Sequence, residues 1–489
     1  MSRLEKAIAY VAPTWAASRA RSRGVLAAYE AAKVTRLRIS KGSNESGNGA
    51  VQMAGSRLRD QARYLDENHD LARAVLNAAV QNAIGTGIGI EPQPRIKGGN
   101  QDIHGDLQWA LIKAFKRWCE APEVTGAHDF GSMQRLMFRS MFRDGEGFGQ
   151  HVLGVAPGLV HGSSVPYSVE MLEADMVPLD YAEQGFVQGV RLNAWNRPTH
   201  FSVYKIHPRD ILAFTDWQTK IVSADRMMHY KLADRIGQLR GVSVFASVLE
   251  RLDDVKDYET SERIAAKIAA SMAAMIRKGD PGMYTPPGEG KGKDREIRMR
   301  PGMIFDDLLP GESVEMIDTN RPNTNLEAFR QGQLRAVAGG TGVTYSTIAR
   351  HYDGSYSSQR QELVEAQGSY RILSDLFVSQ ALRPIYRNFV SAAVLQGVVK
   401  IPRNVDLESL YDALYIPPRM PWIDPKKEAE AYALLEDRAY VAGSEIVREL
   451  GKNPNDVIDA QKRWKADKKA AGIEEIPVKA SNVPDTIEG

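Results

Sequence analysis

The sequence predicts an α+β fold in which long helices adjoin a region of short strands. Apolar residues recur at helical spacing through 242–278 and again from 326 to 397, the spacing that puts side chains on one face of a helix. Between 165 and 232 the pattern changes to short apolar or alternating runs bounded by Gly, Pro, Asn and Asp, which is typical of strands. Helical periodicity returns after Asp424.

The amino-acid composition limits which classes of protein this chain could belong to. The 489 residues include 63 Lys and Arg against 61 Asp and Glu, a net charge of +2, so we do not expect a protein that binds nucleic acid tightly through many phosphates.

Cys119 is the only cysteine, which excludes internal disulfides and cysteine-based zinc sites and fits a reducing cytoplasm. We expect it to be buried beside Trp118. No stretch approaches the roughly 18 to 20 apolar residues that span a bilayer, and no export signal is evident, so a soluble chain is expected.

The first 241 residues divide into an arm and a mixed domain. Residues 1–55 contain a basic, Ala-rich stretch with Arg19, Arg21 and Arg23, followed by the linker KGSNESGNG. A basic arm could bind nucleic acid, but a solvated helix face or a strap on a neighbouring subunit is the favoured interpretation. Beyond it, helices are expected over 56–84, over 106–119 and around Met133–Met141. In GTGIGIEP the glycines are out of step for a dinucleotide fingerprint, because Ile90 stands where a third glycine would be required, so a tight turn is expected.

Strands are expected in VPYSVEMLE, FVQGVRLNA, THFSVYKIH and RMMHYKL. Hairpins are expected around AWNRP and around RDGEGFGQH, where Gly145, Gly147 and Gly149 could supply the turn geometry.

A single helix is expected from Val242 to about Lys278. About 35 residues at about 1.5 Å each give a rod of about 50 Å. Its charged side carries Asp253, Asp254, Asp257, Glu259 and Glu262. A carboxylate cluster could bind a divalent metal for nuclease chemistry, but a solvated helix face is the favoured interpretation.

A Gly- and Pro-punctuated insert follows the rod. Strands are expected at 296–300, 303–308 and 313–317. Its basic run consists of Lys291, Lys293, Arg295, Arg298 and Arg300. The run is not a phosphate-binding loop, because Asp294 replaces the Ser or Thr that would follow Lys293.

The stretch from 326 to 397 is expected to form a helix, a loop and a second helix. The first helix should end at Gly339, Gly340 and Gly342, and YSTIARHYDGSY has neither helical nor alternating pattern. Ser358 with Gln361 fits a capping box, and Pro384 should kink the second helix before it ends near Gly397.

The C-terminal part is expected to pass through the proline-punctuated stretch 398–423 and then form three helices. The first should begin at Pro425, capped by Asp424, the second near Ser444, and the third should run from about Asn453 to Lys469. The remainder is expected to be disordered.

Several segments resemble the phage portal proteins of the lambda family. The most specific is GGTGVTYSTIARHYDGSYSSQRQELVEAQ, which is similar to the helix, tunnel loop and long helix of such portals. Others, in the order portals use, are LEKAIAYVAPTWAASRARSR, SRLRDQARYLDENHDLARAVLNAAVQNAIGTGIGIEP, GQLRGVSVFASVLERLDDVKDYETSERIAAKIAA, PGMIFDDLLPGESVEM and PWIDPKKEAEAYA.

The resemblance implies a portal-like division of the chain. The implied parts are an arm at 1–55, a wing at 56–241, a stem helix at 242–279, a clip at 280–323, a second stem helix at 324–343, a tunnel loop at 344–357, a long kinked helix with a return to the wing at 358–423, a crown at 424–470 and a tail at 471–489.

It also implies a structural function without catalysis or cofactors. Portals of this kind form a ring, by resemblance of twelve copies, at one capsid vertex in the virion, after assembly in the host cytoplasm. Double-stranded DNA passes through the ring during packaging and ejection. Implied partners are the large terminase subunit, the major capsid and scaffold proteins, and head-completion or tail-adaptor proteins.

The residues that would meet these partners follow from the same resemblance. The DNA-channel loop would present Arg350, His351, Tyr352, Asp353 and Tyr356. The stem would line the channel with Asp253, Asp254, Asp257 and Glu262. The clip would dock partners through Lys291, Lys293, Arg295 and Arg298.

Two other classes of protein remain possible from the residues. One is a DNA-processing nuclease or recombinase, with His351 and Asp353 or the acidic helix face as metal ligands. The sequence has no HExxH, zinc-ligand pattern, phosphate loop or GxSxG turn to support it. The other is a different ring-forming tail connector.

Overall fold

The computed structural model describes residues 45–98, 102–183, 185–210, 218–271, 275–278, 312–315, 326–352, 354–418 and 425–471. The chain divides into a short unit, Met1–Ala50, and a large unit, Val51–Gly489. The basic arm with Arg19, Arg21 and Arg23 and the C-terminal tail lie outside the described residues. Apart from the first turn of α3, every described helix and strand belongs to the large unit.

The expected helix over 56–84 is two helices, α3 (Gly47–Asn68) and α4 (Asp70–Ala83). α3 begins inside the stretch that sequence alone assigns to a linker. The break falls at His69, whose Nδ1 accepts a hydrogen bond from the backbone N–H of Leu71 and caps α4. The GTGIG turn is confirmed, since Gly85 and Gly87 both have positive φ.

The next two helices match their expected positions. α5 spans Gly105–Trp118 and α6 spans Phe130–Asp144. Trp118 is fully buried, stacks on Tyr167 with ring centroids 5.3 Å apart, and donates its indole N–H to the Tyr167 carbonyl at 2.8 Å. Cys119 follows it, packed partly buried against the same core, and burial raises the pKa of its thiol.

Two antiparallel sheets contain most of the described strands. The first has the order β3-β2-β8 and the second the order β4-β5-β6-β7. Their strands are β2 (Glu146–Leu153), β3 (Tyr167–Leu172), β4 (Phe186–Val187), β5 (Val190–Leu192), β6 (Pro198–Tyr204), β7 (Thr219–Ser223) and β8 (Met227–Lys231). Short 3-10 helices lie beside them at η2 (Ala174–Met176) and η4 (Ala224–Arg226).

One of the two expected hairpins is confirmed and the other is wrong. AWNRP joins β5 to β6, as expected. RDGEGFGQH is not a turn: Gly145 ends α6 with φ +88, and the residues after it form β2. Gly147 and Gly149 are inside that strand, where a Cβ would lie 2.4 Å from the Tyr230 ring and 2.5 Å from Met228. These two glycines admit large neighbouring side chains and do not turn the chain.

A buried ionic cluster joins α3 to the sheets. Glu146 is fully buried and contacts Arg59 at 3.0 Å, Arg240 at 2.7 Å and His229 at 2.9 Å. Arg240 also donates to the backbone carbonyls of Gln188, Ala174 and Val177. Burial would raise the pKa of the Glu146 carboxyl, but the Arg240 guanidinium and the hydrogen bond with His229 hold that pKa well below its ordinary value.

The expected single rod is shorter and is preceded by a tight turn. Residues 244–247 form a 3-10 helix, η5 (Val244–Ser247), and α7 spans Leu249–Ser271. The segment that should have continued the rod is instead a strand, β9 (Met275–Lys278), paired antiparallel with β10 (Glu312–Glu315). β10 overlaps the third strand expected in the insert, and the other two lie outside the described residues.

The helical region after the insert has more elements than expected. α8 spans Leu326–Thr341, α9 Tyr345–Ala349 and α10 Tyr356–Phe377. Gly339 and Gly340 lie inside α8, and only Gly342, with φ +72, follows its end. The cap of α10 is Ser355, whose side chain accepts from Ser358 N, so the expected cap at Ser358 is wrong.

The expected irregularity at Pro384 is present. α10 continues into a π-helical turn, η6 (Val378–Leu382), and then α11 (Arg383–Leu395). Proline has no N–H and its ring clashes with the carbonyl four residues back. The helix widens to accommodate it, so that Arg383 N–H bonds to Val378 O. The segment ends at Gly397, with φ +75.

The rest of the chain returns to the body and then forms three helices. After η7 (Glu408–Tyr411), β11 (Ala413–Ile416) pairs antiparallel with β1 (Gly89–Pro92). The three C-terminal helices are α12 (Pro425–Asp437), α13 (Gly443–Glu449) and α14 (Pro454–Ala470), close to expectation. Asp424 lies outside the described residues. None of the helices described is long and apolar enough to cross a membrane.

Candidate functional site

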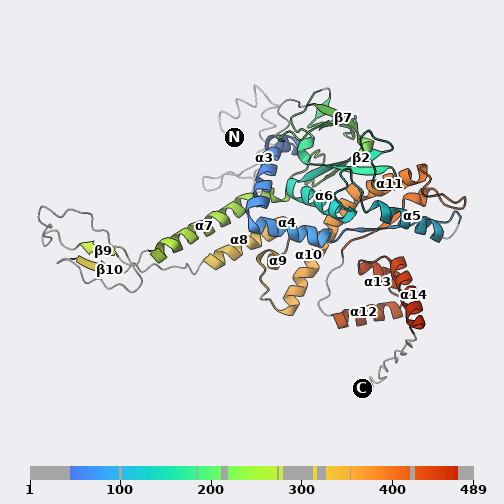
Figure 1. Cartoon of the computed structure of the whole chain (residues 1–489). Helices are drawn as coiled ribbons and strands as arrows, with labels where there is room; N and C mark the ends of the chain where they lie inside the picture. Colours follow the sequence, from blue (N-terminus) through green and yellow to red (C-terminus); the bar gives the residue numbers. More distant parts are fainter. Residues whose placement is uncertain are drawn as a thin grey trace, which may run out of the picture. The chain divides into compact units, whose positions relative to one another are not determined.

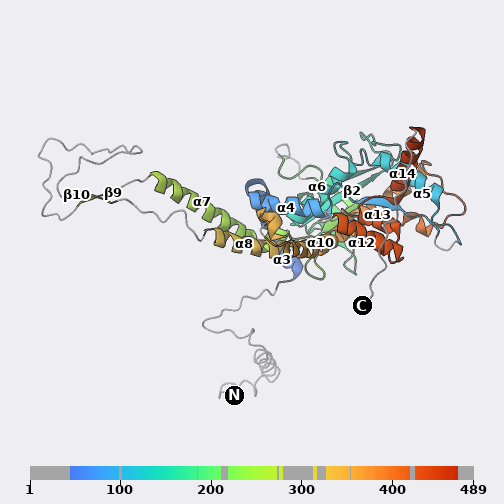
Figure 2. The same cartoon turned by 90° about the horizontal axis from the view of Figure 1, so that it is seen from below.

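Two neighbouring helices, α7 and α8, carry the candidate channel residues. They run side by side in both views of the chain (Figures 1 and 2). Arg330 Nε of α8 contacts Glu259 Oε1 of α7 at 2.7 Å, and Arg251 donates to Gln333 at 3.0 Å. The rings of Tyr258 and Phe329 pack with centroids 4.7 Å apart. These contacts fix the two helices against each other.

Gly340 permits the close approach where α8 meets the start of α7. A Cβ built on Gly340 would lie 2.5 Å from Val248 Cγ1, whereas one on Gly339 would meet nothing within 4 Å. Real Cβ atoms do not approach a neighbour as closely as 2.5 Å. Of the glycines in this run, Gly340 is therefore required by packing and Gly342 by its positive φ.

The segment expected to be one loop is anchored over its first half. Ile348 of α9 is only 3% exposed and Val343 before it is 2% exposed. The backbone N–H of Ser346 donates to Glu362 Oε1 of α10 at 3.2 Å, and Thr344 Oγ1 donates to Thr347 Oγ1 at 2.6 Å. α9 is thus part of the core, which corrects the expectation of a loop from 344 onward.

The described residues between α9 and α10, which lie within 350–355, are exposed. Arg350 ends α9 in the left-handed conformation, with φ +53, and is exposed together with His351 and Tyr352. The Gln359 amide donates to the carbonyls of Tyr352 and Gly354 and ties the loop to the start of α10. Of the other candidate loop residues, Asp353 and the side chain of Tyr356 are outside the described set.

The candidate acidic residues of α7 do not share one face. Asp253, Asp254 and Asp257 are exposed, while Glu262 is buried, with 7% exposure. Nine residues separate Glu262 from Asp253, which at 3.6 residues per turn places the two on opposite sides of the helix. Glu262 therefore does not lie with the exposed carboxylates of α7 in this chain.

The basic residues of the insert, Lys291, Lys293, Arg295 and Arg298, lie outside the described residues. The pairing of β9 with β10 places Lys278 opposite Glu312. The insert therefore leaves and re-enters the described structure at neighbouring positions.

A group that could resemble a metal site is composed of Glu173, Asp175 and His207, whose ligand atoms lie within 4.8 Å of one another. Arg59 binds Asp175 at 3.1 Å, and Arg63 contacts both Asp175 and Glu173. These cations lower the pKa of the Asp175 carboxyl against the opposing effect of its burial. The carboxylates thus already have counter-charges, so the group gives no support to metal-dependent nuclease chemistry.

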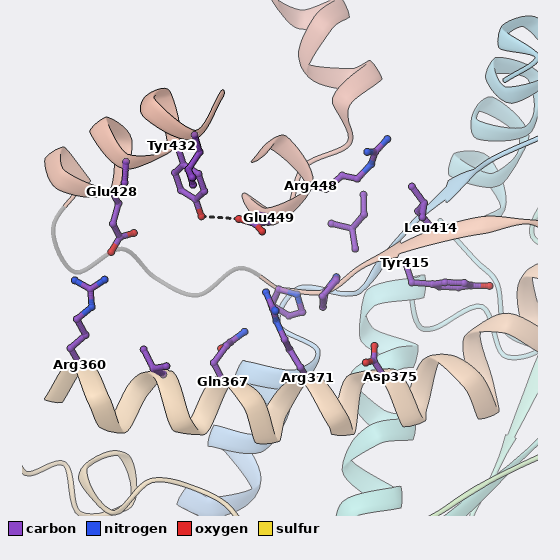
Figure 3. A pocket seen from close by; sticks show the side chains of 16 residues that line it. Arg360, Gln367, Arg371, Asp375, Leu414, Tyr415, Glu428, Tyr432, Arg448 and Glu449 are labelled. Atoms are coloured by element: carbon purple, nitrogen blue, oxygen red, sulfur yellow. Dashed lines mark hydrogen bonds between the residues drawn. The ribbon is translucent and has the colours of Figure 1, made fainter. Parts of the chain in front are cut away.

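A pocket of about 600 Å³ that sequence reasoning missed lies between α10, β11 and the helices α12 and α13. Figure 3 shows Arg360, Gln367 and Arg371 projecting from α10 toward it. On the opposite side Tyr432 donates its hydroxyl to Glu449 at 3.0 Å. Arg448, also in the lining, binds the buried Glu91 at 3.1 Å. No sequence motif marks this pocket, because it forms where α10 packs beside elements that are distant from it in the sequence.

Comparison with known proteins assigns the family. A family model described as phage portal protein, lambda family, matches residues 34–373. A probable portal protein of Halomonas phage phiHAP-1 is 25% identical over 452 residues, covering 88% of this chain and 84% of that protein. Portal protein B of Escherichia phage lambda is 22% identical over 265 residues, covering 48% of this chain and 49% of that protein.

The solved structures that resemble this chain share less sequence identity with it. A chain from the virion of a native gene transfer agent particle gives a TM-score of 0.44 at 14% identity, covering 82% of this chain and 94% of that one. An HK97 family phage portal protein from Corynebacterium diphtheriae gives 0.31 at 12% identity, covering 76% and 98%. The assignment comes from the sequence match, which extends from before α3 into α10 and takes in α7, α8 and α9. Because that match covers more than half of its residues, the chain belongs to the lambda family of phage portal proteins.

Proposed function

We propose that this chain forms a closed ring at one vertex of a phage capsid and that DNA passes through the ring during packaging and ejection. The family match over residues 34–373 carries the proposal. As a member of this family, the chain is a structural portal protein of the virion, the connector between head and tail. The proposal adds the closed ring, of twelve copies, its assembly in the host cytoplasm and the absence of catalysis.

Exposed apolar side chains support the ring. Val364 and Ile372 of α10 and Ile264 of α7 are each more than half exposed. Large apolar side chains that are exposed in a free chain can be covered by a partner protein. In a ring of identical subunits the partner surface is another part of the same chain.

Within the ring, the proposal assigns DNA contact to the exposed loop residues Arg350, His351 and Tyr352, with Asp353 and Tyr356 beside them. An arginine repeated once per subunit can touch phosphates without reading the base sequence. The exposed Asp253, Asp254 and Asp257 would repel phosphate and keep the duplex free to slide.

Partner docking is proposed for the insert, through Lys291, Lys293, Arg295 and Arg298. The partners are the large terminase subunit during packaging and head-completion or tail-adaptor proteins afterwards. Contacts with the major capsid and scaffold proteins are assigned to other surfaces of the ring.

Because Ile348 is buried, a test of the loop has to leave this residue in place. A deletion that begins at Ile348 would remove a core side chain, so the variant should change only exposed residues. Arg350→Ala with His351→Ala should leave rings intact by negative-stain microscopy and lower the amount of DNA packaged or retained in heads. The matched control is Lys400→Ala with Arg403→Ala, two exposed cations outside the loop. Heads of the loop variant that fill and hold their DNA like the control would remove these residues from the DNA path.

A further inference from the structure

A cleft of about 460 Å³ lies between the three-stranded sheet and the π-helical turn that leads into α11. One wall comes from η4 and β8, and the other from η6 and the first turns of α11. The walls are tied together, because the Gln380 side-chain carbonyl accepts a hydrogen bond from Lys231 N at 2.7 Å. β8 is an edge strand of its sheet. The cleft is therefore built from fixed elements and exists before any ligand binds.

Three arginines line this cleft. Arg197 comes from the β5–β6 turn, and Arg383 and Arg387 come from α11. All three are exposed, and none forms an ion pair with a carboxylate among the residues that the structure describes. The carboxylate in the lining is that of Asp225, which accepts a hydrogen bond from the Ser223 hydroxyl. The lining therefore carries more positive than negative charge.

Two histidines in the lining do not add to this charge. Burial lowers the pKa of His151 and of His229 to about 4 each, so both are neutral near pH 7. His151 Nδ1 lies 2.8 Å from the Tyr167 hydroxyl, and His229 Nε2 lies 2.9 Å from Glu146. The excess charge comes from the guanidinium groups alone.

The placement of the two α11 arginines costs the isolated chain stability. Arg383 and Arg387 stand four residues apart, so they share one helix face, and like charges at that spacing destabilise a helix. Their positions beside the cleft are set by the wide turn at η6, in which Arg383 N–H bonds to Val378 O. An anion bound between them would relieve the repulsion.

We propose that this cleft binds phosphate groups of the DNA backbone, as a contact built from residues other than those of the loop at 350–355. A guanidinium fork matches the oxygen geometry of a phosphate group. Contacts of this kind hold a duplex without reading its sequence. The inference depends on the proposed function only for the presence of DNA beside the protein.

The test measures DNA binding by assembled rings as a function of salt. The cleft variant is Arg383→Gln with Arg387→Gln, and the control is Lys400→Gln with Arg403→Gln, which removes the same charge from exposed positions outside the cleft. Fluorescence anisotropy with a short duplex of mixed sequence gives the slope of log K against log salt. Removing one arginine that binds a phosphate should reduce that slope by about 1, so the cleft variant should show a reduction of about 2 and the control none.

A second variant tests the cleft without changing any residue of α11. Arg197→Gln lies on an exposed turn and should reduce the slope by about 1. Slopes equal to that of the unmodified rings in both cleft variants would overturn the proposal. So would full displacement of the duplex by inorganic phosphate at the same phosphate concentration, which would indicate a small-anion site. Weaker binding to poly-glutamate with an unchanged DNA slope would assign the cleft to an acidic protein instead.

These outcomes are separable from failure of the proposed function. Rings that form and package DNA, but whose cleft variants bind it unchanged, reject only the cleft. A chain that forms no rings rejects the portal role itself.

Discussion

At the scale of single residues, Glu146 holds α3 and the sheets together. Its carboxylate is the counter-charge for both Arg59 and Arg240, and all three side chains are buried. Replacing Glu146 by Gln leaves the buried Arg240 without a carboxylate partner and leaves Arg59 with Asp175 alone, which should cost about 3–5 kcal/mol of unfolding free energy. Urea unfolding followed by tryptophan fluorescence measures the change.

Glu170→Gln is the matched control for this prediction. Glu170 pairs with Lys220 at 3.3 Å, but both side chains are about one third exposed. Loss of such a pair should cost about 0–1 kcal/mol. Equal effects of the two substitutions would mean that the buried cluster is not a main source of stability.

The buried histidines predict a dependence of stability on pH. The pKa of His151 and of His229 is about 4 in the fold, against about 6.5 in an unfolded chain. Between these values the unfolded chain binds more protons, so stability is highest above pH 6.5 and falls as the pH drops toward 4. Each histidine can contribute at most about 1.4 kcal/mol per pH unit. Urea midpoints at pH 7 and pH 5 should differ less in His151→Gln, and an unchanged difference would contradict the neutral buried state of His151.

At the scale of elements, the contact between α7 and α8 depends on Gly340. Gly340→Ala places a methyl group against the buried Val248, and overpacking of this kind costs about 1–3 kcal/mol. Gly339→Ala, one position away in open space, should instead gain about 0.5–1 kcal/mol from helix propensity. Thermal unfolding of the two variants tests the difference in sign. If both substitutions stabilised the protein, the Val248 side chain would move aside at little energetic cost.

The elements that sequence alone predicted well are those with local signals. α5, α6, α13 and α14 have amphipathic patterns or capping residues that need no distant partner, and Pro384 predicts the break before α11 from its own chemistry. The split at His69 was not predictable, because it depends on a contact between His69 Nε2 and Leu252 O, 183 residues away. α9 was missed for a related reason: five residues give too little periodicity, and burial of Ile348 in the core decides the outcome.

The same contrast between local signals and distant contacts applies to the candidate site. Resemblance located the loop near Arg350, but not which half of it is exposed. Helical periodicity itself places Glu262 opposite Asp253, so the separation of these two carboxylates could have been predicted from the sequence. The arginine cleft could not be predicted from the sequence, because Arg197 and Arg383 line one cleft only through the packing of β8 against η6.

At the scale of the whole molecule, the insert between β9 and β10 should be separable from ring assembly. Lys291→Glu with Lys293→Glu and Arg295→Glu reverses charge within a segment that starts and ends at one hairpin. The docking proposal requires these side chains to be exposed, and substitutions at exposed positions cost about 0.5 kcal/mol or less, so rings should form. Packaging by terminase should fail, because the docking charges are reversed. Normal packaging, or loss of assembly, would contradict the proposed docking role.

The closed ring is the central claim, and native mass spectrometry of the purified 54.2 kDa chain tests it most directly. The exposed apolar residues of α7 and α10 should be covered by neighbouring copies, so the spectrum should show one dominant closed assembly at twelve times the chain mass. Negative-stain images of the same sample should show rings with a central opening. A chain that stays monomeric across the concentrations at which portals assemble, and that cuts DNA when a divalent metal is added, would contradict the account.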